Sequence, residues 1–132
     1  MILNCAIIDE DPEALALLKH YVEETPSLNL IGAYRNAIEA VDGIHHNHLD
    51  ILFLAIHMQQ ISGLEFAKLV PMNVKIIFTT AFKEYAIEAY KVNAFDYLVK
   101  PIQYEDFMQT CQKVFDHYMQ DDAYNPIKRD GF

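Results

Sequence analysis

Side chains that could bind a cation and an anion follow several short apolar runs in this chain. Asp9, Glu10 and Asp11 come directly after one run, Thr80 ends another and Lys100 follows a third. Adjacent carboxylates offer the hard oxygen ligands that Mg²⁺ prefers. A hydroxyl and an ammonium group suit a phosphoryl group, the first by hydrogen bonding and the second as a point charge. These residues would form a site for phosphoryl chemistry if the fold brings them together.

The position where such a site would carry its nucleophile holds a methyl group. The apolar run Ile51–Leu54 is followed by Ala55, at a point where an α/β protein usually places a reactive side chain. Alanine cannot form an acyl phosphate in any protonation state. No nucleophile–base pair is visible elsewhere in the sequence, so the chain is not predicted to be an enzyme.

Each of these residues also has a purely structural explanation. Asp11 is suited to cap a helix, and Glu10 could be a solvated loop charge. Thr80 could cap the helix that follows it, and Lys100 could form an ion pair with Asp9. Their common position at the ends of apolar runs favours the joint interpretation over four separate ones.

The elements that must position these residues alternate between strands and helices. Apolar runs rich in β-forming residues predict strands at 2–8, 28–34, 51–54, 74–79 and 95–99. Helices are predicted from 12 to about 25, 36 to about 45, 62 to about 70, 83–91 and 103 to about 120. The helix-start signals are Asp11-Pro12, Asn36 with Glu39, and Ser62 with Glu65.

This alternation predicts an α/β fold with a doubly wound, five-stranded parallel sheet and helices on both faces. In such a sheet, ligands bind at the carboxyl ends of the strands, near the point where the strand order reverses. The candidate residues should therefore meet at one edge. The last helix carries an apolar stripe that is expected in the core, formed by Phe107, Val114, Phe115 and Tyr118.

Composition limits the functions that remain. The chain has 132 residues, 52% of them hydrophobic, which suits one folded domain rather than a disordered segment. Its net charge of −9 argues against direct nucleic-acid binding, which needs clustered Lys and Arg. No apolar run approaches the ~20 residues of a membrane span, and residues 1–11 do not resemble a signal peptide. We therefore expect a cytoplasmic protein without membrane contact, with Cys5 and Cys111 as buried, reduced thiols.

Four histidines raise the question of a zinc site. They are His45, His46, His48 and His57. No cysteine or carboxylate pattern completes a tetrahedral ligand set around them, so zinc is not predicted.

Five segments of the chain resemble the response-regulator receiver domain of two-component signalling. They are, in order, 6–12, 52–58, 62–65, 77–81 and 96–101. The resemblance covers residues 1 to about 120 and implies a flavodoxin-like receiver with strand order 2-1-3-4-5. The amino-acid sequences of segments 78–86 and 94–102 are similar to those of receivers of LytTR-type regulators. This implies a DNA-binding output domain outside the chain, reached through a linker or tail at 121–132.

The resemblance implies a metal site at the first strand end. Asp9 and Glu10 would hold Mg²⁺ together with the backbone carbonyl of His57, and Ala55 occupies the position of the phospho-accepting aspartate. One of the three carboxylates expected around the metal is therefore absent. We expect Mg²⁺ to bind weakly, if at all.

The resemblance also implies a conformational switch and partners. Thr80 would be the switch hydroxyl, Tyr97 the aromatic residue that moves with it, and Lys100 the phosphate-binding lysine before a cis peptide to Pro101. A histidine kinase is the implied partner upstream. A homodimer would form through 83–91, 95–99 and 103–120. The aromatic residues in that region, Tyr85, Tyr90, Phe95 and Tyr104, fit either a pairing face or ordinary half-buried packing.

Two explanations for Ala55 remain open. The aspartate was replaced experimentally in an ordinary phosphorelay receiver, or the chain is a natural pseudo-receiver. Gln59 stands where the receiver pattern usually has proline, and an engineered knockout would have no need to change that position. This favours a natural, non-phosphorylatable receiver that acts as a signalling or dimerisation module. A small-molecule binder that uses the vacated pocket is the remaining alternative, although no Gly-rich phosphate loop supports it.

Overall fold

Strands and helices alternate along the chain in the computed structural model, which describes residues 1–46 and 48–124, with the backbone alone at 45, 46 and 121–124. The strands are β1 (Leu3–Ile8), β2 (Leu28–Tyr34), β3 (Ile51–Ala55), β4 (Lys75–Thr80) and β5 (Asp96–Val99). The helices are α1 (Pro12–Glu23), α2 (Ala37–His46), α3 (Gly63–Ala67), α4 (Ala86–Lys91) and α5 (Tyr104–Tyr124). A 3₁₀ turn, η1 (Lys83–Tyr85), precedes α4.

The strands form one parallel sheet in the order β2-β1-β3-β4-β5. This confirms the predicted fold class and strand order. The chain passes from β1 outward to β2 and then returns to β3 on the other side of β1, so the order reverses between β1 and β3. The carboxyl ends of these two strands are therefore where a doubly wound sheet places its ligand site.

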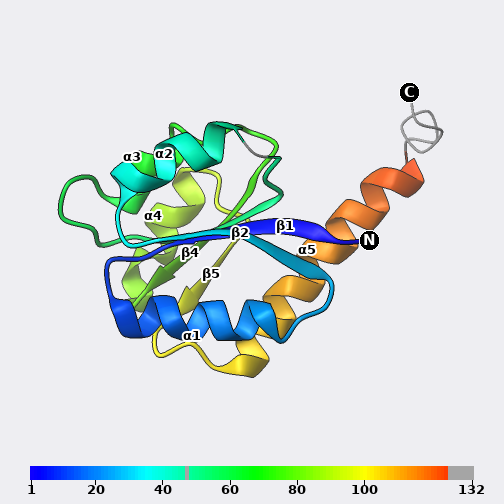
Figure 1. Ribbon diagram of the computed structural model, residues 1–132, viewed down its shortest axis with the longest axis horizontal. Coiled ribbons are helices and arrows are strands. Elements are labelled where there is room, and N and C mark those ends of the chain that lie inside the picture. The colour runs from blue at the N-terminus through cyan, green and yellow to red at the C-terminus, as the bar shows by residue number, and fades with distance from the viewer. Residues whose placement is uncertain (47, 125–132) are drawn as a thin grey trace.

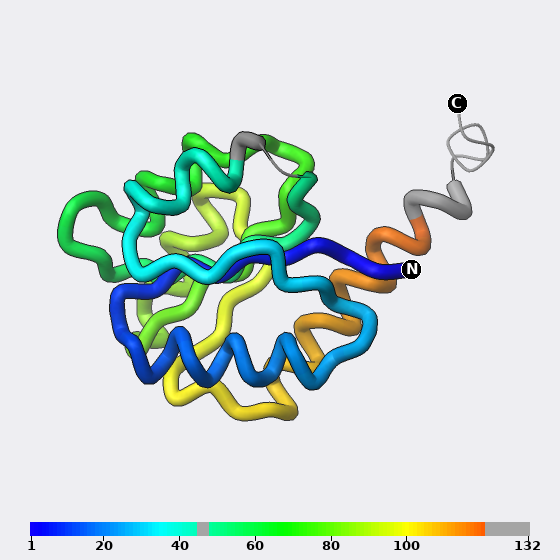
Figure 2. Tube along the Cα trace, viewed as in Figure 1, coloured from blue at the N-terminus to red at the C-terminus, as the bar shows by residue number. Residues whose placement is uncertain are grey.

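Helices cover both faces of the sheet because successive strand residues point to opposite sides. Leu52 and Leu54 pack with the helices α2, α3 and α4, whereas Ile51 and Phe53 pack with α1 and α5. Figure 1 shows α2, α3 and α4 above the sheet and α1 with the first part of α5 below it. Figure 2 traces the chain from the blue amino-terminal strand inside the sheet to the orange α5 on the face that also carries the blue α1.

Side-chain caps start three of the helices where the sequence predicts them. The acceptors are the side chains of Asp11, Asn36 and Ser62, and the donors are the backbone N–H groups of Glu13, Glu39 and Glu65, at 3.0, 2.9 and 3.2 Å. Each bond satisfies one N–H group that the first turn of a helix would leave without a partner. Asp11 is therefore a helix cap, as its structural explanation proposed.

Three predicted helix boundaries differ from the structure. α3 ends at Ala67 rather than near 70, because Pro71 disfavours helical geometry at Val70, and the chain closes there in short i→i+3 bonds. The helix predicted at 83–91 divides into η1 and α4, and Phe82 before it provides no side-chain cap. α5 runs to Tyr124, beyond the expected end near 120, so the predicted tail begins as helix. The rest of that tail, 125–132, lies outside the described residues.

The last helix packs against the sheet from Phe107 to Tyr118. Phe107 and Val114 are buried and Phe115 and Tyr118 pack against them, which confirms the predicted apolar stripe. The Tyr118 hydroxyl lies 2.9 Å from the Asp50 carbonyl oxygen and 3.2 Å from that of Asn73. It therefore ties α5 to the amino-terminal edge of the sheet.

Both cysteines are free and buried, as predicted. Burial raises the pKa of Cys5 and of Cys111 to about 12, and the nearby Cys111 and Asp50 add to the effect on Cys5. The two thiols are therefore neutral at pH 7. Within the described part of the chain, no helix has the length and apolar character that crossing a membrane requires.

Candidate functional site

The fold brings the predicted strand-end residues to one edge of the sheet. Ala55 ends β3 and pairs with Thr79, and Thr80 ends β4 next to Val99. The Lys100 backbone N–H donates to the Thr80 carbonyl oxygen at 2.7 Å. The Lys100–Pro101 peptide is cis, as the resemblance implies.

Asp9 and Lys100 form the central ion pair of this edge. The Lys100 Nζ lies 2.7 Å from Asp9 Oδ2, and the Asp9 side chain is 2% exposed. Asp9 Oδ1 accepts a hydrogen bond of 3.0 Å from the Asp11 backbone N–H. Among the described residues, Oδ2 accepts no hydrogen bond. The ion pair with Lys100 is therefore the interaction that offsets the burial of this oxygen. Lys100 thus forms the ion pair with Asp9 that its structural explanation proposed.

Glu10 interacts with the loop after β3 rather than with Lys100. The Gln59 backbone N–H lies 3.0 Å from Glu10 Oε1 and 2.9 Å from Oε2 and donates to this carboxylate. The two residues are 49 positions apart in the sequence. The bond joins the turn after β1 to the loop 56–63, and Glu10 is therefore not simply a solvated charge.

Ala55 lies in a tightly closed part of the backbone. The residue is 1% exposed, and the next amide, that of Ile56, donates to the Thr79 carbonyl oxygen at 3.0 Å. The Gly63 amide returns to donate to the Ile56 carbonyl oxygen at 2.7 Å. A Cβ on Gly63 would overlap the Ala55 carbonyl oxygen, so only glycine lets α3 approach the strand this closely.

The predicted switch residues have well-defined partners. Thr80 is 2% exposed, and its Oγ1 accepts a hydrogen bond of 3.0 Å from the Phe82 N–H. The hydroxyl thus closes the turn after β4; it does not cap η1, because that helix begins beyond Phe82. Tyr97 is half-buried, and its ring meets that of Tyr90 edge-on at 6.1 Å.

A cluster of rings beside the site is not visible in the sequence pattern. His57 contacts Tyr85 and Phe82 edge-on, with ring centroids 4.7 and 5.3 Å apart. These contacts join the loop after β3 to the turn after β4. Next to them lies an open pocket of about 430 Å³, lined by Glu10, Ile56, His57, Met58, Gln59, Ser62, Leu64 and Tyr85. The signal that could have found the cluster is the ring that follows each of two neighbouring strands, His57 after β3 and Phe82 after β4.

The donors at this edge do not fit a divalent cation. Mg²⁺ needs oxygen ligands in near-octahedral geometry. Asp9 is committed to Lys100 and the Asp11 amide, Glu10 to the Gln59 amide, and Ala55 has no oxygen in its side chain. In the described part of the chain, no group of three His, Cys, Asp or Glu residues could hold a metal ion.

The histidines are not brought together either, as far as the structure describes them. His48 Nε2 lies 3.0 Å from Asp50 Oδ1 at the amino-terminal edge of the sheet. His57 lies at the other edge, among the aromatic rings. The side chains of His45 and His46 lie outside the described residues.

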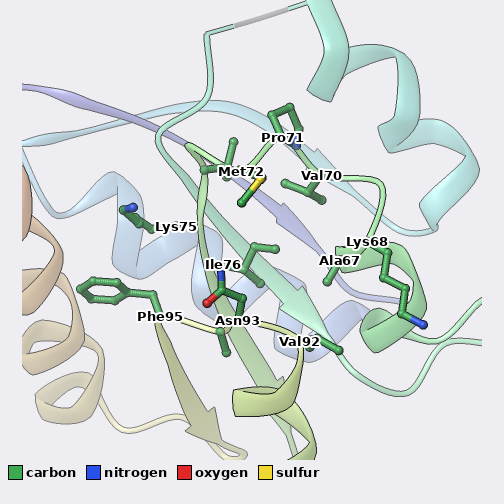
Figure 3. Close-up of a pocket in the computed structure, with 12 residues that line it drawn as sticks. Ala67, Lys68, Val70, Pro71, Met72, Lys75, Ile76, Val92, Asn93 and Phe95 are labelled. Atoms are coloured by element: carbon green, nitrogen blue, oxygen red, sulfur yellow. The ribbon is translucent and has the colours of Figure 1, made fainter.

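A further pocket, of about 340 Å³, lies away from the candidate site (Figure 3). It is bordered by 67–76 and 92–95, at the amino ends of β4 and β5. Nine of its twelve lining residues are apolar; the other three are Lys68, Lys75 and Asn93, and none is acidic. None of the predicted site residues contributes to it.

A doubly wound sheet with an acidic residue, a hydroxyl and a lysine at its carboxyl edge defines a receiver-like α/β domain. The family model described as "Response regulator receiver domain" matches residues 5–112. The chain belongs to this family.

Known relatives agree with this assignment. The chain is 39% identical over 102 residues to the transcriptional regulatory protein BtsR of Escherichia coli, a match that covers 76% of this chain and 43% of BtsR. It is 34% identical to an uncharacterized response regulatory protein of Vibrio cholerae, covering 95% of this chain and 53% of that protein. The chain thus spans about half the length of the relatives it matches.

Solved structures show the same fold. The response regulatory domain of mrkE from Klebsiella pneumoniae superposes with a TM-score of 0.80 at 26% identity, covering 89% of this chain and 99% of that one. The response regulator TrrA from Thermotoga maritima, solved in complex with Mg²⁺-BeF, gives 0.76 at 27% identity, covering 86% and 99%.

Proposed function

We propose that this receiver works without phosphorylation, as an interaction module of a transcriptional response regulator. The observation that carries the proposal is Ala55, which ends β3 and is 1% exposed; the resemblance to receivers assigns this position to the phospho-accepting aspartate. At the same edge of the sheet, Asp9 pairs with Lys100, and Glu10 accepts from the Gln59 amide. We take Ala55 to be native, which the encoding genomic sequence tests directly.

Acetyl phosphate tests the proposal. Incubation with acetyl phosphate and Mg²⁺ is expected to add no phosphoryl group, because a methyl group cannot accept one. Intact-mass measurement checks this, with TrrA treated in parallel to show that the reagents are competent. A stoichiometric adduct on this chain that hydroxylamine removes would contradict the proposal.

We infer that the output is a DNA-binding domain of LytTR type beyond this chain. One support is the resemblance of the sequence at 78–86 and 94–102 to receivers of that type. Another is that relatives about twice as long as this chain are named transcriptional regulatory proteins. The chain itself carries a net charge of −9 and is not expected to bind DNA. The full-length gene product tests this inference, because an output domain of another class would exclude it. A cytoplasmic location and a histidine kinase upstream belong to the same proposal.

We propose a homodimer through α4, β5 and α5. Two large apolar side chains of α4, Ile87 and Tyr90, are 66% and 56% exposed. Such groupings mark interaction surfaces. Tyr104 of α5, which the sequence also offered for this face, instead packs edge-on against Tyr21 of α1.

Tyr90→Asp is expected to weaken the dimer at least about tenfold in sedimentation experiments, because a central aromatic residue often carries more than about 1.4 kcal/mol of binding energy. Ile38→Asp, on α2, replaces an equally exposed apolar side chain away from this face and should leave the dimer unchanged. A monomer at all concentrations, or equal effects of the two variants, would rule out this surface.

A further inference from the structure

The loop 56–63 is fastened to the turn after β1 by one carboxylate. Both oxygens of Glu10 lie within 3.0 Å of the Gln59 backbone nitrogen. Hydrogen bonds to an ionised acceptor are about twice as strong as those between neutral groups. Among the described residues, the Gln59 amide is the one hydrogen-bond donor to Glu10. The contact therefore fixes both the carboxylate and the loop.

The bond depends on the backbone of residue 59 and not on its side chain. The donor is an amide N–H, which every residue except proline provides. A proline at this position would leave the Glu10 carboxylate free to turn toward another cationic or polar partner. Glutamine at position 59 therefore binds the Glu10 carboxylate through its backbone N–H.

Asp9, the other acidic residue at this edge of the sheet, also has its partners within the protein. Asp9 is 2% exposed, pairs with the Lys100 ammonium at 2.7 Å and accepts from the Asp11 amide at 3.0 Å. A cation at this edge would compete with an ammonium group and an amide N–H for the Asp9 carboxylate. It would gain no third carboxylate in return, because residue 55 is alanine.

We propose that the Gln59 N–H and the Lys100 ammonium bind the carboxylates of Glu10 and Asp9 in place of a divalent cation, so that the loop 56–63 is latched to the turn after β1 and these two carboxylates do not bind metal. This inference rests on the proposed loss of phosphorylation, since a receiver that needs metal for its chemistry could not close its pocket. The latch reaches further through His57, whose ring contacts Phe82 and Tyr85 in the turn after β4. These contacts join the loop after β3 to the segment that follows Thr80.

Two matched substitutions at position 59 test the role of this amide, because one removes the N–H and the other keeps it. Gln59→Pro removes the N–H, whereas Gln59→Ala keeps it and removes only the side chain. With Mn²⁺ as the probe, followed by the electron paramagnetic resonance of the free ion, Gln59→Pro is expected to bind at least about tenfold more tightly than wild type. Gln59→Ala should stay within about twofold of wild type, because the main-chain donor is intact. Equal Mn²⁺ affinities of the proline and alanine variants would overturn the proposal.

A second measurement does not depend on the proline variant folding. Hydrogen exchange of the Gln59 amide is expected to be slow in the wild-type chain and at least about tenfold faster in Glu10→Ala. Glu13→Ala removes a nearby acid that follows the Asp11 cap and should leave this rate unchanged. An unprotected Gln59 amide, or equal rates in the two variants, would exclude the latch. The acetyl phosphate experiment depends on Ala55 alone, so failure of the latch and failure of the proposed function can be told apart.

Discussion

Replacing Lys100 with methionine is expected to lower the free energy of unfolding by about 2–3 kcal/mol. The Asp9 carboxylate is 2% exposed; its Oδ2 has no hydrogen-bond partner among the described residues and forms an ion pair with the Lys100 ammonium. Removing one partner of a buried ion pair leaves an uncompensated charge, which usually costs about 3–5 kcal/mol. The Lys100 side chain is 21% exposed, so water screens part of the cost, and we expect a loss at or below the lower end of this range. Urea unfolding at pH 7 measures the change.

Lys113→Met is a matched control for this prediction. Lys113 also pairs with a mostly buried carboxylate, since its Nζ lies 3.3 Å from Asp96 Oδ2. Asp96 keeps two further donors, the Thr110 hydroxyl at 2.7 Å and the Tyr97 amide at 2.8 Å. Lys113 is also 64% exposed, so its loss should cost less than about 1 kcal/mol.

The double variant Asp9→Asn with Lys100→Met separates charge from packing. It removes the buried negative charge together with its partner, and should recover more than half of the loss. Equal costs for Lys100→Met and Lys113→Met would show that the Asp9 pair does not stabilise the fold as argued.

The sheet could be predicted from the sequence because its causes are local. Apolar runs mark the strands, and the predicted limits of β2 agree with the structure. The caps at Asp11, Asn36 and Ser62 each involve a donor two or three residues away, so their pattern is readable in the sequence. The division of 83–91 into η1 and α4 was missed because no capping side chain marks the true start.

The candidate site was predictable only in part. Parallel strands bring their carboxyl ends together, so the meeting of Asp9 and Lys100 follows from the fold class. The bond between Glu10 and the Gln59 amide does not follow, because its donor is a backbone group that no side-chain pattern reveals. The orientation of the Thr80 hydroxyl toward Phe82 depends on the geometry of a turn, which propensities do not specify.

Beryllofluoride, a mimic of the acyl phosphate, is expected to leave the amide NMR shifts of Thr80 and Tyr97 unchanged in this chain. A receiver switches when new anionic oxygens recruit a hydroxyl and a lysine and thereby bias a two-state element. Here Ala55 offers no carboxylate to hold the mimic, Lys100 is paired with Asp9, and the Thr80 hydroxyl accepts from the Phe82 amide. Spectra recorded with and without beryllofluoride and Mg²⁺ test this, with TrrA as the responsive control.

Restoring the acceptor should show which groups silence the switch. Ala55→Asp alone is expected to respond weakly, because Glu10 remains bound to the Gln59 amide. Ala55→Asp with Gln59→Pro should shift the amides of Thr80 and Tyr97, because the acid pair is then free on one side and the acceptor is present. The same double variant with Thr80→Ala should lose the shift at Tyr97, since the hydroxyl is the link between the two. Shifts in the unmodified chain would instead show that another acid, with Asp9 the nearest candidate, has taken over the acceptor role, and that the silent-receiver proposal is wrong.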